Sequence, residues 1–143
     1  MRILNRRASY EYFLFDKTEA GLVLTGPEVK SVKAGRLQFE GSFIKERAGE
    51  LWLFNANIPL YRFSPSENYD PRRARKLLLH KNEVLAIFAR ARQKNLTLVP
   101  VSCYTKGQRG IIKLEIALAR GKRKFEKRAA IKKREEAVSR ISL

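Results

Sequence analysis

The sequence contains few of the residues that most often carry out catalysis or bind metals. Its 143 residues include one cysteine, Cys103, and one histidine, His80, and the only aspartates are Asp16 and Asp70. These residues lack the spacing of a zinc site, and no glycine-rich phosphate loop or nucleophile motif occurs. We therefore predict that the protein is not an enzyme and that it uses no cofactor and no metal ion.

Long apolar runs are also missing. No run approaches the roughly 20 residues that a membrane-spanning helix requires, and Arg2, Arg6 and Arg7 interrupt the start of the chain, unlike a signal peptide. A lone cysteine excludes an internal disulfide and is typical of a reducing compartment. The sequence thus predicts a cytoplasmic protein with no membrane partner, and we expect a monomer.

Basic residues, in contrast, are abundant. The chain has 31 Lys and Arg against 14 Asp and Glu, a net charge of +17. Residues 120–143 alone carry +7, and residues 1–119 carry the remaining +10. Such an excess of positive charge in both parts indicates a nucleic acid partner.

The charge distribution also suggests a division into two parts, a folded RNA-binding domain at residues 1–119 and a basic tail at residues 120–143. The tail has few large apolar side chains. Their burial cannot offset an ordering cost of roughly 1–2 kcal/mol per residue. We therefore expect the tail to be disordered in the free protein.

The pattern of apolar residues predicts a mainly β fold with about three helices. Strands are expected at residues 7–16, 22–24, 42–48, 51–54, 58–63, 96–106 and 112–118, with a turn at residues 20–21. Helices are expected at residues 26–34, after a capping box of Thr25 and Glu28, from Asp70 onward, and at residues 81–94. About six short strands with few helices indicate a small closed antiparallel barrel.

Two basic clusters in the folded part are candidate RNA contacts. Arg72, Arg73, Arg75 and Lys76 fall on about one turn of the helix expected after Asp70, and no other acidic residue is nearby in the sequence. Phosphate groups would relieve the repulsion among these cations. Lys30, Lys33 and Arg36 form the second cluster, for which a solvated helix face is an equally good interpretation.

Two further residues fit RNA binding. His80 could begin a helix or donate a hydrogen bond to RNA. Phe125 lies among the cations of the tail, where an aromatic ring is suited to stack on an exposed base. From the residues alone, we predict a small barrel that binds structured RNA, with a tail that folds on contact.

Three other interpretations remain open from the residues alone. A general single-stranded or structured RNA-binding module would show no preference for one folded RNA. An RNA-processing enzyme would degrade RNA in the presence of magnesium, and a structural ribosomal protein would purify in equal amounts with all ribosomes.

The whole chain resembles the SsrA-binding protein family, also called small protein B, the partner of tmRNA in bacterial ribosome rescue. The resemblance rests on short blocks that occur in the family order: Asn5-Arg6-Arg7-Ala8, Glu19-Ala20-Gly21, Gly26-Pro27-Glu28-Val29-Lys30-Ser31, Ala34-Gly35, Asp70-Pro71-Arg72-Arg73, Arg75-Lys76-Leu77-Leu78-Leu79, Leu98-Val99-Pro100 and Ala119-Arg120-Gly121-Lys122.

This resemblance implies a six-stranded oligonucleotide-binding-like barrel that binds the tRNA-like domain of tmRNA and occupies the place of a tRNA anticodon arm. By match to the family motifs, Asn5, Glu19 and Leu78 are the implied RNA-face positions. Their implied neighbours include Arg6, Arg7, Gly21, Glu28, Lys30, Lys33, Arg36, Arg72, Arg73, Arg75, Lys76 and His80. A core position for Leu78 and a helix-capping role for Glu28 are the structural alternatives.

The resemblance also implies a role for the tail in trans-translation, the rescue of stalled ribosomes with tagging of the nascent peptide. The matching segment is Gly121-Lys122-Arg123-Lys124-Phe125-Glu126-Lys127-Arg128. In the family this segment enters the empty mRNA channel at the decoding centre of the small ribosomal subunit and becomes helical there. Position 125 is more often His or Tyr in the family, and position 126 is commonly Asp, so Phe125 can stack but cannot donate a hydrogen bond.

Overall fold

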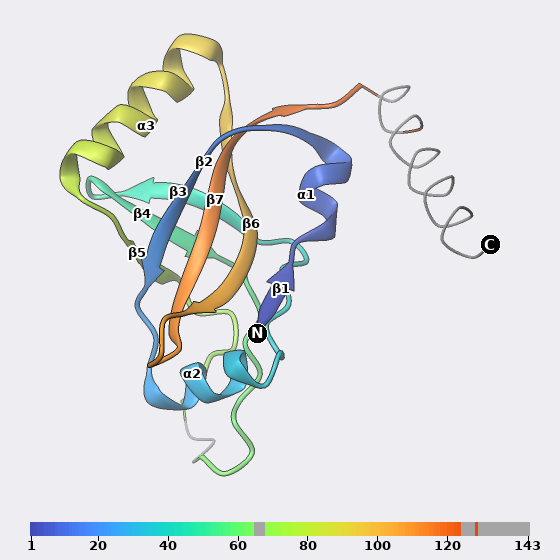
Figure 1. Cartoon of the computed structure of the whole chain (residues 1–143), viewed down its shortest axis with the longest axis vertical. Helices are drawn as coiled ribbons and strands as arrows, with labels where there is room; N and C mark the ends of the chain where they lie inside the picture. The colour runs from blue at the N-terminus through green and yellow to red at the C-terminus, as the bar shows by residue number, and fades with distance from the viewer. Residues whose placement is uncertain (65–67, 124–127, 129–143) are drawn as a thin grey trace.

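A computed structural model describes residues 1–64, 68–123 and 128 of the chain. These residues form one mainly β fold with three helices, as the sequence predicted. The elements are β1 (Arg2–Leu4), α1 (Arg6–Glu11), β2 (Tyr12–Leu22), α2 (Gly26–Lys33), β3 (Phe43–Arg47), β4 (Glu50–Phe54), β5 (Arg75–Leu78), α3 (Lys81–Lys94), β6 (Thr97–Lys106) and β7 (Ile111–Gly121). Figure 1 shows α2 and α3 at opposite ends of the strands.

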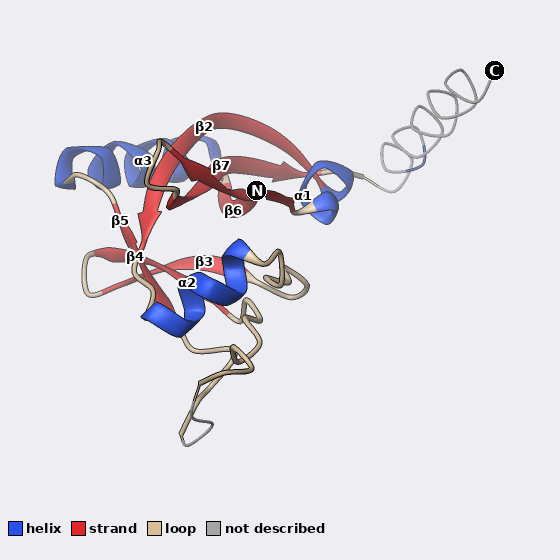
Figure 2. Cartoon of the chain, turned by 60° about the horizontal axis from the view of Figure 1, so that its bottom comes forward, coloured by secondary structure: helices blue, strands red, loops and turns tan. Residues whose placement is uncertain are grey.

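Seven strands, not six, make up a single antiparallel sheet in the order β1-β6-β7-β2-β5-β4-β3. The sheet bends at β5, so β3 and β4 cross behind β2, β6 and β7 and form a second layer (Figures 1 and 2). β1 and β3 end the order, and β3 lies close to β6 without a strand ladder between them in the described residues. The predicted closed six-stranded barrel is therefore not confirmed, and the hydrogen-bonded sheet is open.

The core lies between the two layers and is built by strand alternation. Ile3, Cys103, Leu114 and Ala20 oppose one another across β1, β6, β7 and β2, and all point inward. From the second layer Ile44, Leu51 and Leu53 point to the same core. Residues at alternate positions point outward, so the sheet presents one outer face on each layer.

The N-terminal segment differs from the predicted pair of strands at residues 7–16 and 22–24. Residues 6–11 form α1, and Ala8, 2% exposed, packs against Val99 and Ala119. β2 then runs without a turn through Ala20 and Gly21. Aromatic residues in alternation favour a strand locally. The burial of Ala8 against the sheet instead stabilises a short helix of about one and a half turns.

The segment between β4 and β5 also differs from its prediction. Residues 58–63 form no strand, and the chain does not enter a helix at Asp70. Instead, Asp70 Oδ1 accepts a hydrogen bond from the backbone N–H of Arg72 at 2.9 Å, and the chain then extends into β5. The same Asp side chain that caps helices also closes such turns, which is why the sequence was ambiguous here.

Among the remaining elements, β1 was not predicted, and the other helices and hairpins confirm their predictions. α2 begins at the capping box of Thr25 and Glu28, α3 spans Lys81–Lys94, and the hairpins β3–β4 and β6–β7 form at the expected places. β7 extends to Gly121, so Arg120 and Gly121, which the sequence assigned to the tail, are its last two residues.

Candidate RNA interface

The outer face of the first layer carries a row of opposed residues that crosses five strands. Strand register places Arg2 opposite Tyr104, Tyr104 opposite Lys113, Lys113 opposite Gly21 and Gly21 opposite Leu78. Directly opposed residues point to the same side of a sheet. The row thus combines two cations, an aromatic ring and an exposed leucine, and we name it the Leu78 face.

Gly21 allows Leu78 to lie flat against the sheet. A Cβ atom added at Gly21 would lie 3.0 Å from Leu78 Cβ and 3.4 Å from Leu78 Cδ1. Leu78 nevertheless keeps 53% of its surface exposed, so it is not a core residue. A glycine that makes room for an exposed apolar side chain produces a smooth surface against which a flat ligand can pack.

Glu19 lies next to this row and is the centre of a small hydrogen-bonded cluster. Its carboxylate accepts a hydrogen bond from Tyr104 Oη and another from Lys106 Nζ, the latter at 3.0 Å. The bond from Tyr104, then that from Lys106, hold the pKa of Glu19 below its usual value. Burial and the bond to Glu19 raise the pKa of Tyr104 to about 12. The cluster therefore stays as carboxylate and phenol at neutral pH.

Cations continue around this face. The Arg2 guanidinium lies 4.7 Å from the centre of the Tyr104 ring. On the other side, a hollow of about 460 Å³ opens beside Leu78, and Lys76 and Lys81 are among the residues that line it. His80, which is exposed, precedes α3, and its backbone N–H donates to Glu83 Oε1 at 3.1 Å. His80 thus lies at a helix start, where RNA contact is sterically possible.

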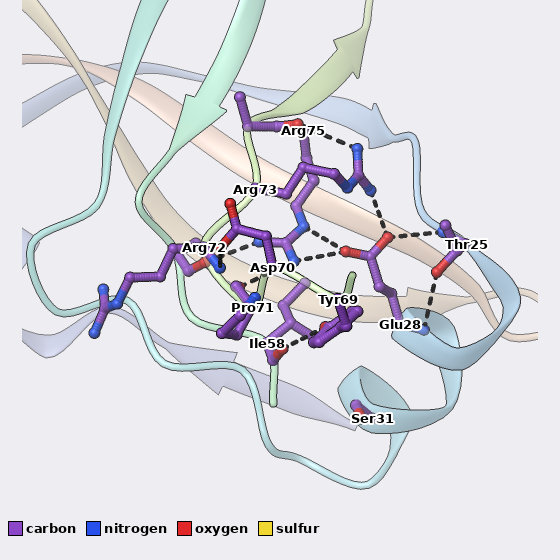
Figure 3. Close-up of polar contacts among 12 residues, drawn as sticks. Thr25, Glu28, Ser31, Ile58, Tyr69, Asp70, Pro71, Arg72, Arg73 and Arg75 are labelled. Carbon is purple, nitrogen blue, oxygen red and sulfur yellow. Dashed lines mark hydrogen bonds and ion pairs between the residues drawn. The ribbon is translucent and has the colours of Figure 1, made fainter. Parts of the chain in front are cut away.

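Glu28 forms a buried cluster with two arginines that the sequence had placed on an RNA-binding helix (Figure 3). Its side chain is fully buried and accepts hydrogen bonds from Thr25 N at 2.8 Å, Arg75 Nε at 2.8 Å and Arg73 Nη2. Arg75, also fully buried, donates to the carbonyls of Ala56 at 2.8 Å and Pro71 at 3.0 Å. Burial works to raise the pKa of Glu28, but these hydrogen bonds outweigh it and hold the pKa below its usual value.

These contacts revise the predicted arginine cluster. Arg72, Arg73, Arg75 and Lys76 lie in a turn, the segment after it and β5, not on a helical turn. Three of them, Arg73, Arg75 and Lys76, have acidic partners. Lys76 Nζ lies 2.9 Å from Glu50 Oε1, and Arg72, which is exposed, donates to the carbonyl of Asn55 at 3.0 Å. Arg75 and Glu28 therefore hold the segment from inside, while Arg72, Arg73 and Lys76 reach the surface.

The other predicted positions lie apart from Leu78. Asn5 Nδ2 donates to the carbonyl of Pro100 at 2.7 Å and so joins the start of α1 to β6. Arg6 and Arg7 are exposed on α1, next to β1 at the far edge of the sheet. Lys30, Lys33 and Arg36 are exposed on or just after α2, and Lys30 Nζ lies 5.3 Å from the centre of the Tyr61 ring. The structure therefore does not bring all predicted contacts into one site.

Sequence reasoning missed three residues of the Leu78 face, namely Arg2, Tyr104 and Lys113, and also Lys106, which bonds to Glu19 beside it. The alternation of β6 and β7 contained a usable signal, because Tyr104 and Lys106 are polar or aromatic residues two positions apart after the buried Cys103. The opposition of Tyr104 to Arg2 and Lys113 depends on strand register, which the sequence alone did not specify.

Only part of the predicted ribosome-binding tail lies within the described residues. Lys122 is held by two hydrogen bonds to α1, from its backbone N–H to the carbonyl of Glu11 and from Nζ to the carbonyl of Ser9, both at 2.8 Å. Arg123 and Arg128 are exposed. Lys124, Phe125, Glu126 and Lys127 lie outside the described residues.

Within the described ranges, no group of three or more His, Cys, Asp or Glu side chains could hold a metal ion. Likewise, none of the helices in this part of the chain is both long enough and apolar enough to cross a membrane.

Comparison with known proteins identifies the family of this chain. The family model described as SmpB protein matches residues 2–141. An SsrA-binding protein of Thermobifida fusca is 50% identical over 131 residues, which are 92% of this chain and 81% of the relative. The SsrA-binding protein of Carboxydothermus hydrogenoformans is 44% identical over 93% of this chain and 88% of its own length.

A solved structure gives the same result for the fold. A chain from the work described as "tmRNA-SmpB: a journey to the center of the bacterial ribosome" superposes with a TM-score of 0.70 and 44% sequence identity. The match covers 91% of this chain and 94% of that chain. With a family match over nearly all its length and relatives of this identity, the chain belongs to the SmpB (SsrA-binding) protein family.

Proposed function

We propose that this protein binds the tRNA-like domain of tmRNA and delivers it to stalled ribosomes, where it takes part in trans-translation. The relatives are named for SsrA binding, and the solved relative is described together with tmRNA and the bacterial ribosome. The observation in this chain that carries the proposal is the close approach of Gly21 and Leu78, which presents an exposed leucine among the cations of the Leu78 face.

In this proposal the Leu78 face contacts the folded RNA directly. Leu78 packs against a ribose or base, and Arg2, Lys106 and Lys113 neutralise phosphates. Glu19 is kept ionised by Tyr104 and Lys106, so it accepts hydrogen bonds from a base or a ribose hydroxyl. Arg72, Arg73, Lys76 and His80 extend the contact along β5, and Asn5, Arg6, Arg7, Lys30, Lys33 and Arg36 lie farther out.

Glu28 and Arg75 act as positioning residues here. Their buried ion pair, with the bonds of Arg75 to the carbonyls of Ala56 and Pro71, holds the start of β5 in place and thereby sets where β5, with Lys76 and Leu78, joins the sheet. Substitution of either residue should disturb RNA binding through this segment and not through a lost phosphate contact.

The same proposal includes other expectations drawn from the sequence. The protein acts in the cytoplasm as an RNA-binding adaptor without enzymatic activity, and residues 121–128 probe the empty mRNA channel of the small subunit. The division into a domain and a basic tail, and closure of the sheet into an oligonucleotide-binding-like barrel, belong to the proposal as well; the proximity of β3 to β6 supports closure.

A competition titration near physiological salt tests the function. Labelled tRNA-like domain of tmRNA is bound to the full chain and displaced by unlabelled tRNA-like domain or by an unrelated folded RNA of equal length. We expect a preference of two or more orders of magnitude, about 2.8 kcal/mol. Equal displacement would contradict the proposal and would favour a general RNA-binding module.

The Leu78→Ala variant tests the site in the same titration. Because Leu78 is exposed, its removal should leave thermal unfolding unchanged while weakening binding of the tRNA-like domain several-fold. Leu85→Ala is the matched control, since Leu85 is 59% exposed on α3 and is not part of the Leu78 face. Equal losses for both variants would remove Leu78 from the site.

A further inference from the structure

The outer face of the second layer carries a second group of aromatic and basic side chains. Strand register places Phe43 opposite Phe54 and Lys45 opposite Trp52, with Arg47 two residues beyond Lys45 on β3. Ile44, Leu51 and Leu53, at the intervening positions, are buried, so these five side chains point away from the core. We name this group, Phe43, Lys45, Arg47, Trp52 and Phe54, the hairpin face.

The side chains of the hairpin face already stack on one another. The Phe43 and Phe54 rings lie 5.4 Å apart and 16° from parallel. The Arg47 guanidinium lies 3.9 Å from the centre of the Trp52 ring, and Lys45 Nζ lies 5.4 Å from the centre of the Phe43 ring. Flat rings next to cations suit a base and its phosphate.

The charge of this region favours an anionic partner. Lys76, directly opposite Trp52 on β5, adds a third cation, and Glu50 is the one acidic residue on the outer side of this part of the sheet. A hollow of about 240 Å³ between β3 and α1 borders Phe43 and Lys45, and Arg7 and Glu11, which lie 3.9 Å apart as an ion pair, also line it. An apolar protein surface would gain little from this set of cations.

Two observations distinguish the hairpin face from simple packing within a hairpin. Phe43 is 41% exposed, so much of its ring remains available. In addition, among the described residues Trp52 Nε1 is buried and has no hydrogen-bond partner. Phenylalanine would pack there without leaving a donor unsatisfied, so the presence of tryptophan indicates a use for its larger ring.

The hairpin turn makes the face rigid enough to present these rings. Ala48 and Gly49 adopt positive φ angles of 55° and 80°, and the Gly49 N–H donates to Glu46 Oε1 at 2.7 Å. This geometry matches the tight turn that fixes the register of a two-residue hairpin. The aromatic rings therefore stay aligned without a bound ligand.

We propose that the hairpin face is a second nucleic-acid site, which binds unpaired nucleotides of single-stranded RNA by stacking their bases. Strands β1, β6, β7 and β2 lie in one layer of the folded sheet and the β3–β4 hairpin lies in the other (Figure 2). The two layers meet at β5, which carries Leu78 and Lys76, so an RNA held on the first layer leaves Phe43 on β3 uncovered. This inference does not depend on the proposed tmRNA function. It predicts that the protein can contact two RNA segments at once.

Tryptophan fluorescence offers a local test, because Trp52 is the single tryptophan of the chain. The full-length protein is titrated with an eight-nucleotide oligoadenylate, and with an abasic RNA backbone of equal length and charge. Stacking predicts strong quenching by oligoadenylate and little quenching by the abasic backbone at saturation. Equal quenching by both, or none by oligoadenylate, would overturn the proposal.

A pair of matched variants adds a second test. Phe43→Leu should raise the oligoadenylate concentration at half-quenching about ten-fold, as expected for one lost stacked base. Phe15→Leu is the control, since Phe15 is 44% exposed but belongs to β2. Both variants should unfold thermally like the parent protein. Unchanged half-quenching for Phe43→Leu, or an equal shift for Phe15→Leu, would contradict the site.

Affinity for folded RNA separates the two faces. Phe43→Leu should leave binding of the tRNA-like domain unchanged, while Leu78→Ala should leave half-quenching by oligoadenylate unchanged. If both variants weakened both RNAs to the same extent, one continuous surface would bind them, and the proposal of a separate site would fail.

Discussion

At the scale of single residues, the fold uses charge in two different ways. Glu28 and Arg75 are fully buried and bonded to each other, to Arg73 and to backbone groups, so their charges stabilise the interior. Glu19 and Leu78 lie at the surface, where they remain available to a ligand. Family resemblance identified all of these positions, but only burial separates the supporting residues from the contacting ones.

The pKa of Glu28 makes a prediction about acid stability. Since its folded-state pKa lies below the usual value of 4.5, the ionised group stabilises the fold above that pH, and this contribution is lost as the pH falls through the folded pKa. The difference in unfolding free energy between the parent and Glu28→Gln should therefore be largest near pH 7 and shrink below pH 4.5. Urea unfolding at several pH values measures this difference.

The control for this measurement is Glu50→Gln. Glu50 forms a partly exposed pair with Lys76 at 2.9 Å, and such pairs contribute about 0–1 kcal/mol. The unfolding free energy of the Glu50→Gln variant should stay within about 1 kcal/mol of the parent value across the pH range. A difference for Glu28→Gln that did not vary with pH would contradict the ionised, bonded state of Glu28.

The contact between Gly21 and Leu78 predicts a non-additive pair of substitutions. Gly21→Ala places a Cβ atom 3.0 Å from Leu78 Cβ, so Leu78 must shift, at a cost of about 1 kcal/mol or more. In a Leu78→Ala background the Cβ–Cβ contact remains but the contact with Cδ1 is absent, so the same substitution should cost less. Denaturant unfolding of the four proteins measures the coupling, and additive effects would show that the two residues do not restrict each other.

At the scale of elements, the strength of local signals decided which predictions were correct. The capping box of Thr25 and Glu28 and the apolar spacing of α3 are redundant signals, and both helices formed where expected. Asp70 and Pro71 gave one ambiguous signal, and Asp70 closes a turn instead. A tertiary contact decided the structure of the segment after Asp70. Arg75 pairs there with Glu28 from 47 residues away, which no local pattern could indicate.

The residues of the candidate site, like the elements of the fold, could be predicted only where the sequence signal is local. The Leu78 face depends on strand register across five strands, so its members from β1, β6 and β7 were not found from the sequence. The basic residues of β5 were found because they cluster locally, but their assignment to a helix was wrong. Local clustering therefore identified the segment, and only the sheet showed which side chains point outward.

The end of β7 predicts different results for two truncations. A chain that ends after Ala119 loses the pairs of Arg120 with Phe13 and Gly121 with Tyr12, and both hydrogen bonds of Lys122 to α1. A chain that ends after Lys122 keeps them. We expect the first truncation to lower the melting temperature and the second to leave it unchanged, as measured by circular dichroism.

Function should respond differently to these truncations. Under the proposed function, the chain that ends after Lys122 binds the tRNA-like domain like the parent but does not support peptide tagging on stalled ribosomes. Loss of both activities in that folded, stable protein would show that the tail belongs to the RNA-binding surface instead.

At the scale of the whole molecule, positive charge covers more than the predicted site. The net charge is +17, and cations occur on the Leu78 face, the hairpin face and α2. If both proposed sites bind RNA, the two layers of the folded sheet give this small protein one RNA-binding surface each (Figure 2). This arrangement suits an adaptor that must contact more than one part of a large RNA assembly.

The charge predicts how affinity depends on salt. If binding of the tRNA-like domain neutralises about six phosphates, log affinity should fall with log salt concentration at a slope of about −4 to −5. Lys113→Gln should reduce this slope by about one, because it removes one cation of the Leu78 face. A flat dependence in a titration from 50 to about 300 mM salt would mean that stacking and shape dominate binding.

The buried position of Cys103 gives the protein an internal reporter of local opening. Its thiol is inaccessible in β6, between β1 and β7, and burial raises its pKa to about 12. A thiol reagent can therefore react only when the sheet opens, and β1, with three residues, is the shorter of the two neighbouring strands. The labelling rate of this single cysteine would thus measure how often the edge strand that carries Arg2 separates from the sheet, and whether bound RNA closes it.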